Sequence, residues 1–204
     1  MEKLFTSGRI RELRESGGTV LPLLDTDEAL TLLRTLAKPG VLKEPPTCLR
    51  ESAGNGKGGA YHQIAKPPMA LQALADVVGT ALRDKGIEVM RNGKHLLLRY
   101  GEGAVNFAHQ DKGDGRCAYQ CVLMLSKPGE DFRGGATYVI DSASGVATEL
   151  ECAEAGNLIV FRARSEDEGY LPNLPARHFY HGMRVVERGS SDVCSRVALG
   201  LFQP

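Results

Sequence analysis

Short apolar runs separated by turn residues fill the second half of the sequence, and they constrain the fold more than any other feature. Glycine, proline and aspartate stand between many of these runs, while valine, isoleucine, leucine and tyrosine are common within them. Many short strands with turns between them are typical of an all-β sandwich or barrel. The runs occupy residues 95–100, 107–111, 119–125, 136–140, 158–161, 183–186 and 197–202.

The first part of the chain has a different pattern, which predicts helices with irregular breaks. Acidic residues precede apolar residues at helical spacing at 29–36, and Pro39-Gly40 ends that run. A second apolar stripe covers 68–82 and stops near Gly86. Both stripes are expected to pack against the sheet rather than against a partner.

The length of 204 residues suits one domain with a sizeable core. We expect residues 1–94 to form a helical support with a lid loop, and residues 95–204 to form the β core. The lid candidate is Glu44–Lys66, which has a glycine-rich tip. Arg164–Arg177 is a second loop that is expected to shape the mouth of a pocket.

The balance of charges limits the kinds of partner. Lysine plus arginine and aspartate plus glutamate number 25 each, so the chain as a whole has no electrostatic footprint for nucleic acid or a membrane. No stretch is long and apolar enough to span a bilayer, and the first residues lack the apolar run of a signal peptide. Five cysteines without a Cys-x-x-Cys pair predict reduced thiols in a cytoplasmic or nuclear protein.

A polar break, His-Gln-Asp at 109–111, interrupts the strand-like sequence. Side chains two positions apart on a strand point to the same face, so His109 and Asp111 can both hold one metal ion. A third ligand must come from elsewhere, and the best candidate late in the chain is His181, with His178 as its competitor. Two histidines and a carboxylate that leave the opposite positions open suit iron(II) and O₂ chemistry. The alternative is a surface polar pair and an unrelated core histidine.

Arg196 begins an otherwise apolar strand near the end of the chain. An arginine that faces inward needs an anion, and its guanidinium fork matches a carboxylate with two parallel hydrogen bonds. The sequence therefore predicts a carboxylate co-substrate at Arg196. An internal salt bridge with an aspartate or glutamate is the structural alternative.

The order of these motifs resembles that of the iron(II)- and 2-oxoglutarate-dependent dioxygenases. The resemblance covers about residues 96–202 and rests on the set as a whole, since His-x-Asp alone occurs often by chance. It implies a double-stranded β-helix (jelly roll) as the catalytic core, in a mainly β (α+β) chain with N-terminal helices. The matching residues are Arg99-Tyr100-Gly101, His109-Gln110-Asp111, Phe132-Arg133-Gly134-Gly135, His181-Gly182 and Arg196-Val197-Ala198-Leu199.

The resemblance also implies an activity and a role for each residue. Such an enzyme uses Fe(II), O₂ and 2-oxoglutarate, and it couples oxidation of 2-oxoglutarate to hydroxylation or demethylation at a C–H bond of a substrate. His109, Asp111 and His181 are then the metal ligands, because the residues after His181 match the strand of the distal ligand. Arg196 binds the co-substrate, and Tyr100 matches a position whose hydroxyl often helps to hold it.

Two departures from the family pattern bear on the co-substrate. The interval from His181 to Arg196 is longer than usual, and Ser190–Cys194 looks inserted. Met124 stands where prolyl-hydroxylase relatives place a tyrosine for the co-substrate. Ascorbate therefore remains an alternative co-substrate or reductant.

The primary substrate stays open between a small molecule, a protein side chain and a nucleobase. Gly113–Cys117 is similar to prolyl hydroxylases of the oxygen-sensing type. Asp114 is also similar in position to a residue of TET-related enzymes that oxidise 5-methylcytosine, and it is a further candidate for the co-substrate site. A plain Gly-Asp-Gly turn is the structural alternative, and a non-catalytic jelly-roll binding module is the alternative to an enzyme. A flipped base needs only one pocket and a short basic track, for which the candidates are Lys57, Lys66, Arg91, Lys94 and Arg133.

Overall fold

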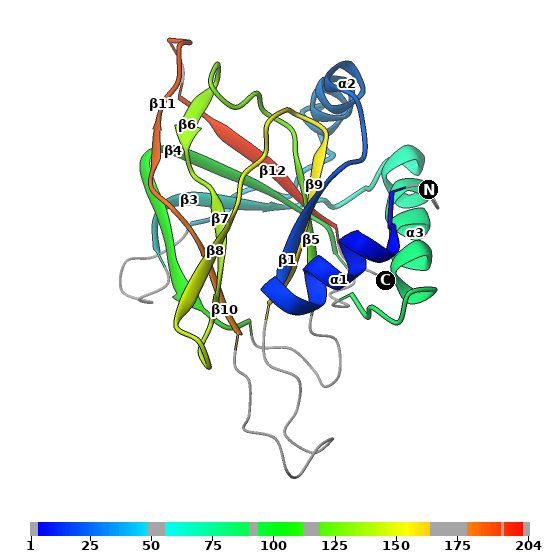
Figure 1. Ribbon diagram of the computed structural model, residues 1–204. Helices are drawn as coiled ribbons and strands as arrows, with labels where there is room; N and C mark the ends of the chain where they lie inside the picture. The colour runs from blue at the N-terminus through cyan, green and yellow to red at the C-terminus, as the bar shows by residue number, and fades with distance from the viewer. Residues whose placement is uncertain are drawn as a thin grey trace.

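Two antiparallel layers of strands face each other and curve towards a barrel, with helices outside one layer (Figure 1). The computed structural model describes residues 4–48, 56–89, 94–111, 119–163, 179–192 and 194–201. The strands are β1 (Gly18–Pro22), β2 (Thr47–Cys48), β3 (Gly56–Gln63), β4 (Leu96–His109), β5 (Tyr119–Met124), β6 (Phe132–Gly134), β7 (Thr137–Asp141), β8 (Val146–Leu150), β9 (Asn157–Arg162), β10 (Phe179–Met183), β11 (Val186–Arg188) and β12 (Arg196–Leu201). The main sheet has the order β1-β9-β5-β12-β4-β10-β7-β8, and β3 pairs with both β2 and β4. The mainly β, jelly-roll fold predicted from the sequence is confirmed.

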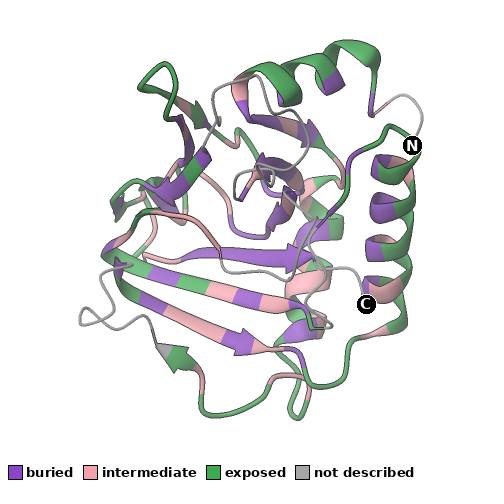
Figure 2. Ribbon diagram, turned by 90° about the horizontal axis from the view of Figure 1, so that it is seen from below, coloured by how far each residue is buried: buried purple, intermediate pink, exposed green. Residues whose placement is uncertain are grey.

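The helices are α1 (Ser7–Ser16), α2 (Thr26–Leu36) and α3 (Met69–Arg83), and the two that the sequence predicts, α2 and α3, are confirmed. Asp25 and Glu28 form a capping box at the start of α2, which satisfies two backbone N–H groups there. The buried positions of α3 are turned towards the strands (Figure 2). Within the described residues, no helix combines the length and the apolar character that a membrane crossing requires.

The segment Glu44–Lys66, expected as a lid loop, contains strand β3 instead, so the loop prediction is wrong for residues 56–63. β3 pairs antiparallel with β4, which gives its backbone groups partners in the sheet. Glycine has a low strand propensity, and the glycine-rich sequence therefore hides the strand. Glycine is nevertheless needed, because Gly58 has a φ of +70° and a Cβ there would meet the Ala104 Cα at 3.0 Å.

Strand β1 also lies in the part of the chain that was expected to be helical. It pairs with β9 from Gly18 opposite Phe161 to Pro22 opposite Asn157. It stands at the end of the main sheet order, where a proline is tolerated because one side of the strand has no ladder to complete. The residues before 94 thus supply strands to the sheet as well as helices.

Two hydrophobic clusters divide the interior of the molecule. An outer cluster joins the helices to one face of the sheet and includes Leu71 and Leu123. An inner cluster fills the space between the strand layers and includes Met124, Phe161 and Met183. Neighbouring residues of β5 enter opposite clusters because side chains alternate along a strand. The inner cluster surrounds the residues of the candidate site.

The long interval between His181 and Arg196 has a structural explanation. Part of it forms β11, which pairs with β6 in a separate two-stranded sheet. After β11 the chain turns closely against the loop before β6, where the backbone N–H of Ser191 donates to the carbonyl oxygen of Glu130. The long interval therefore contributes one strand of a β-ribbon at one end of the barrel, and the apparent insertion, Ser190–Cys194, follows that strand.

Candidate metal centre

Strands β4 and β10 bring the two predicted histidine ligands together. His109 and His181 are direct partners in the antiparallel ladder, so their side chains lie on the same face of the sheet. Asp111 follows β4 and is tied to the end of β9 by a hydrogen bond of 3.1 Å from its backbone N–H to the carbonyl oxygen of Ala163. One potential ligand atom from each of the three side chains lies within 4.8 Å of the other two.

Both imidazole rings are held by their Nδ1 atoms. His109 Nδ1 lies 2.7 Å from the carbonyl oxygen of Phe107, and His181 Nδ1 lies 3.1 Å from the carbonyl oxygen of Ala163. A carbonyl oxygen can only accept, so each ring carries its proton on Nδ1 and leaves the Nε2 lone pair free. Both Nε2 atoms face Asp111, at 3.7 Å for His109 and 3.3 Å for His181. Backbone support of this kind is typical of metal-binding histidines.

The surroundings of Asp111 favour its ionised form, which is the form that binds a cation. Burial alone would raise the pKa of Asp111, but its interactions with His181, helped by His109 and Gln120, hold that pKa below its usual value. Gln120 donates from Nε2 to Oδ2 of Asp111. Burial, followed by the proximity of His181, lowers the pKa of His109. The aspartate is therefore ionised and His109 is neutral near pH 7, as metal ligation requires.

Arg196 is almost completely buried, with 2% of its surface exposed. Its Nη2 lies 3.3 Å from Thr137 Oγ1, whereas its Nε has no hydrogen-bond partner. Among the described residues no carboxylate forms an ion pair with it, so the internal salt bridge considered above does not form within this part of the chain. Burial lowers the pKa of Arg196. A buried cation without a counter-ion is costly, and an incoming carboxylate would relieve that cost.

Two tyrosines, Tyr61 and Tyr100, interact with both Arg196 and Asp111. Tyr100 is the ladder partner of Arg196, and its ring centroid is 5.5 Å from the guanidinium carbon. The Tyr100 hydroxyl donates to the Tyr61 hydroxyl at 3.1 Å. Burial raises the pKa of both phenols, and Asp111 and Arg196 act on each of them with opposite sign. Tyr61 was missed in the sequence because it belongs to β3, in the segment that resembled a loop.

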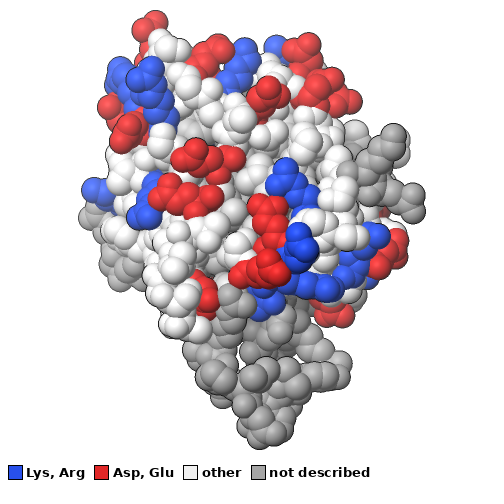
Figure 3. Space-filling model, in the orientation of Figure 1, with Lys and Arg blue, Asp and Glu red and all other residues white. Residues whose placement is uncertain are grey.

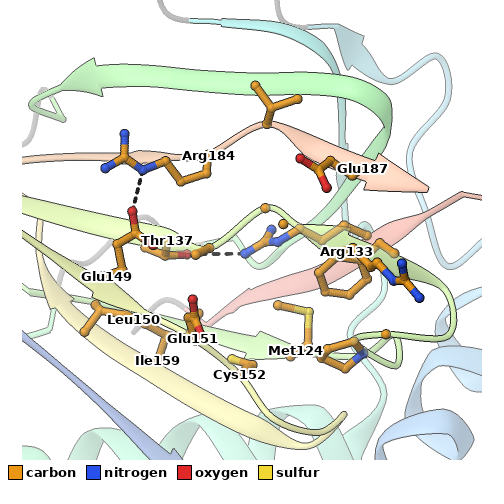
Figure 4. Close-up of a pocket in the computed structure, with 18 residues that line it drawn as sticks. Met124, Arg133, Thr137, Glu149, Leu150, Glu151, Cys152, Ile159, Arg184 and Glu187 are labelled. Atoms are coloured by element: carbon orange, nitrogen blue, oxygen red, sulfur yellow. Dashed lines mark hydrogen bonds and ion pairs between the residues drawn. The ribbon is translucent and has the colours of Figure 1, made fainter. Parts of the chain in front are cut away.

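A cavity of about 540 Å³ opens beside Arg196, and we call it the rear cavity (Figure 4). Met124, at the position where relatives have a tyrosine, is one of its walls, and Thr137 is another. Neither Thr137 nor the cavity has a signal in the sequence, since β7 and β12 are not neighbours in the sheet and only its curvature brings Thr137 to Arg196. The rear cavity is lined by Met124, Pro128, Gly129, Phe132, Arg133, Gly134, Gly135, Ala136, Thr137, Glu149, Leu150, Glu151, Cys152, Ile159, Arg184, Val185, Glu187 and Arg196.

Several predicted positions lie outside the described residues. These are Asp114, His178, Cys117, Arg91 and the loop Arg164–Arg177.

Among the described residues, the basic side chains suggested as a nucleic-acid track do not form one cluster. Lys57 lies opposite Val105, near the metal-ligand end of β4. Lys66 and Lys94 lie at the opposite end of the β3–β4 pair, where Ile64 N–H donates to the His95 carbonyl oxygen. On the face shown in Figure 3, acidic and basic side chains are interspersed.

Comparisons with known proteins agree with this geometry. A family model matches residues 80–201, and that family is described as an oxygenase catalysing oxidative methylation of damaged DNA. No curated protein matches the chain.

Solved structures share the fold at low sequence identity. A prolyl-4-hydroxylase from Pseudomonas putida has a TM-score of 0.65 and 20% identity, covering 97% of this chain and 98% of that one. A 2-oxoglutarate-Fe(II) oxygenase family protein from Burkholderia pseudomallei has a TM-score of 0.63 and 18% identity, covering 95% and 88%. A Trichoplax adhaerens prolyl hydroxylase, in complex with a hypoxia inducible factor peptide fragment, has a TM-score of 0.62 and 14% identity, covering 99% and 96%.

Proposed function

This chain belongs to the oxygenase family described as catalysing oxidative methylation of damaged DNA, and on that premise we propose that it oxidises a methylated base in DNA. It is an enzyme of the iron(II)- and 2-oxoglutarate-dependent class, which uses O₂. We assign His109, Asp111 and His181 as the iron ligands, and Arg196 as the anchor of the 2-oxoglutarate carboxylate that lies away from the metal.

One observation carries the assignment: donor atoms of two imidazoles and a carboxylate lie within 4.8 Å of one another, and a buried arginine without a carboxylate partner among the described residues stands on β12, the strand that pairs with β4. The donor set fits iron(II), because it has two imidazoles and one carboxylate from one side of the site. Iron bound there would mediate the reduction of O₂ by 2-oxoglutarate, which becomes succinate and CO₂, and by a C–H bond of the substrate.

The residues of the chain then have separate tasks. The carbonyl oxygens of Phe107 and Ala163 fix the tautomer of the two histidines, and Gln120 orients Asp111. Arg196 and Thr137 offer N–H and O–H groups to a carboxylate. Such fixed contacts would hold the co-substrate in one orientation.

Two features near the metal ligands support a nucleobase as substrate. Phe107 lies two residues before His109 on β4 and is 50% exposed, and an exposed aromatic ring offers a base a surface on which to stack. Lys57 is exposed on the adjacent β3 and supplies one cation for a phosphate. The balanced net charge of the chain predicts that few phosphates are bound and that the salt dependence is shallow.

The test is direct oxidation of candidate substrates. Iron-loaded enzyme is incubated with 2-oxoglutarate and either methylated DNA, proline-containing peptides or free amino acids, and mass spectrometry detects added oxygen or a lost methyl group. We expect turnover of the methylated DNA, and a Phe107→Ala variant should lose DNA turnover while it still binds 2-oxoglutarate. Turnover of the peptide alone would replace the DNA proposal by protein hydroxylation.

A further inference from the structure

One backbone carbonyl group supports two of the three proposed iron ligands. The oxygen of Ala163 accepts the backbone N–H of Asp111 and the Nδ1–H of His181, each at 3.1 Å. A carbonyl oxygen has two lone pairs, so these two hydrogen bonds use its full capacity. Ala163 is completely buried. A shift of this oxygen would therefore move both ligands.

Arg162, the residue directly before Ala163, is attached to three neighbouring segments. Its backbone N–H donates to the carbonyl oxygen of Gly17 at 2.7 Å. Its Nε donates to the hydroxyl oxygen of Tyr119, its ladder partner on β5, at 3.0 Å. Its guanidinium carbon lies 4.6 Å from the ring centroid of Phe179 and 5.3 Å from that of Tyr119, within the range of a cation–π interaction. These contacts fix the backbone of β9 directly before the Ala163 carbonyl group.

The two aromatic partners of Arg162 begin strands that carry or support a ligand. Phe179 begins β10 and stands two residues before His181. Tyr119 begins β5 and stands directly before the glutamine that donates to Asp111. The side chain of Arg162 thus joins β5 and β10 to the end of β9, and all three strands contribute to the surroundings of the proposed ligands.

The packing around this arginine is tight enough to require a glycine. Gly17 follows α1 with a φ of +81°, and a Cβ there would lie 2.8 Å from Cε1 of Phe179. A side chain at this position would therefore displace the ring that faces Arg162, in addition to the backbone strain. The third attachment of Arg162 depends on this close approach.

We infer that Arg162 is a positioning residue of the metal centre, which holds the end of β9 so that the Ala163 carbonyl group presents Asp111 and His181 to one iron ion. The inference rests on the ligand set assigned under the proposed function. In this account the guanidinium serves the order of the protein around the metal, and not a phosphate of the substrate.

The test removes the guanidinium and compares it with another stacked arginine. The test variant is Arg162→Leu, and Arg184→Leu is the matched control. Arg184 also lies over an aromatic ring, with 4.8 Å to the centroid of Tyr138, and it also donates through Nε, to Glu149 at 2.7 Å. In the part of the chain that the structure describes, neither of these two partners is hydrogen-bonded to a proposed ligand.

Two readouts report on the metal and one on folding. The Kd for Fe(II) is measured without O₂ by competition with a chelator, and the visible absorption bands of Co(II)-substituted protein report the geometry of the ligands. Arg162→Leu should raise the Kd by about tenfold, the lower end of the usual effect of losing a supporting contact, because it acts through Ala163. Its Co(II) bands should shift, whereas Arg184→Leu should keep the Kd and the bands of the wild type. A lower thermal midpoint in Arg162→Leu, with wild-type Kd and bands, would overturn the inference.

A second variant decides the matter if Arg162→Leu does not fold. Tyr119→Phe keeps the ring and removes the hydroxyl that accepts from Arg162. The Kd for Fe(II) should rise by about 2- to 10-fold, the effect of one hydrogen bond. The double variant should have the Kd of Arg162→Leu, because residues that act as a unit are not additive. A wild-type Kd in Tyr119→Phe, or effects of the two substitutions that multiply, would contradict the positioning role.

Further outcomes separate this inference from the proposed function. Retention of iron by His181→Ala would overturn the ligand set, and the positioning role with it. If His181→Ala loses iron while Arg162→Leu and Tyr119→Phe bind it as the wild type does, the ligand set stands and only the positioning role is wrong. Weaker binding of methylated DNA by Arg162→Leu, with a shallower salt dependence and an unchanged Kd for Fe(II), would assign Arg162 to a phosphate instead.

Discussion

The cluster of His109, Asp111 and His181, called the metal end, and the surroundings of Arg196, called the arginine end, differ in how their polar groups are satisfied. At the metal end, Asp111 is hydrogen-bonded by Gln120 and faces both histidines, and each histidine is bonded to a backbone carbonyl oxygen. At the other end, Arg196 is buried with one nitrogen that has no partner. The metal end is organised by its neighbours before any ligand arrives, whereas the arginine end remains costly until an anion binds. Substitutions at the two ends should therefore act on different quantities.

The largest effect is expected when a ligand is removed from the metal end. His181→Ala should lower iron affinity by more than about 100-fold, since loss of a supporting contact alone costs 10–100-fold. Activity should disappear with the iron. Iron content after dialysis measures the effect. The control is His62→Ala, which removes an imidazole from β3, a strand that carries none of the proposed ligands. Retention of iron by His181→Ala would remove His181 from the ligand set.

At the arginine end, the co-substrate should be affected and the metal should not. Arg196→Gln keeps a donor for Thr137 but loses the charge, and loss of a buried charge pair costs roughly 2–5 kcal/mol. The Kd for 2-oxoglutarate should rise by the corresponding factor of about 30 to several thousand. Calorimetric titration measures it, with iron affinity measured in parallel. An equal loss of iron binding would break the separation between the two ends.

A smaller loss of iron affinity is expected when the hydrogen bond from Gln120 to Asp111 is removed. Gln120→Leu removes the side chain that donates to Asp111 while it keeps a similar size. Iron affinity should fall by about 10–100-fold, the usual cost of losing such a partner. Metal titration against a chelator measures the change. Wild-type affinity in this variant would show that Asp111 is held by the histidines alone.

The smallest effect on binding is expected at the Tyr61–Tyr100 pair. Tyr61→Phe removes one hydroxyl of the Tyr61–Tyr100 pair, and a single neutral hydrogen bond contributes about 0.5–1.5 kcal/mol. The Kd for 2-oxoglutarate should rise by about 2- to 10-fold, with iron affinity unchanged. The Kd for 2-oxoglutarate is measured for Tyr61→Phe and for Tyr100→Phe, and equal changes would show that the two hydroxyls act as a unit. Tighter binding in either variant would contradict a supporting role.

The metal end was the more predictable of the two from sequence. His109 and Asp111 are two residues apart in a strand-like segment, and the alternation expected there places both on one face, although β4 ends at His109. Arg196 was also visible, because a charge in an apolar strand requires an explanation. Its surroundings were not. Tyr61 belongs to a glycine-rich segment without a strand pattern. Thr137 contacts Arg196 although β7 and β12 are not neighbours in the sheet, and that contact depends on the curvature of the sheet.

The register between β4 and β10 also decides which side chains point between the two layers of strands. Between His181 and Met183, the partners on β4 shift from His109 to Asn106, so β4 contains one extra residue. A bulge of this kind changes which side chains point inward, and the alternation rule cannot anticipate it. The sequence therefore predicted the chemistry of the ligands, while the shape of the space between them required the three-dimensional structure.

The central claim is that the iron ligands and Arg196 bind the two ends of one molecule of 2-oxoglutarate. The most direct measurement is the thermodynamic coupling between the two ligands, obtained without O₂ by titrating iron(II) with and without 2-oxoglutarate, and the reverse. Linkage requires the two enhancement factors to be equal. We predict that each ligand tightens the other by the same factor, at least about fivefold, and that the factor shrinks in Arg196→Gln. Independent binding, with a factor of one in the wild type, would contradict the account.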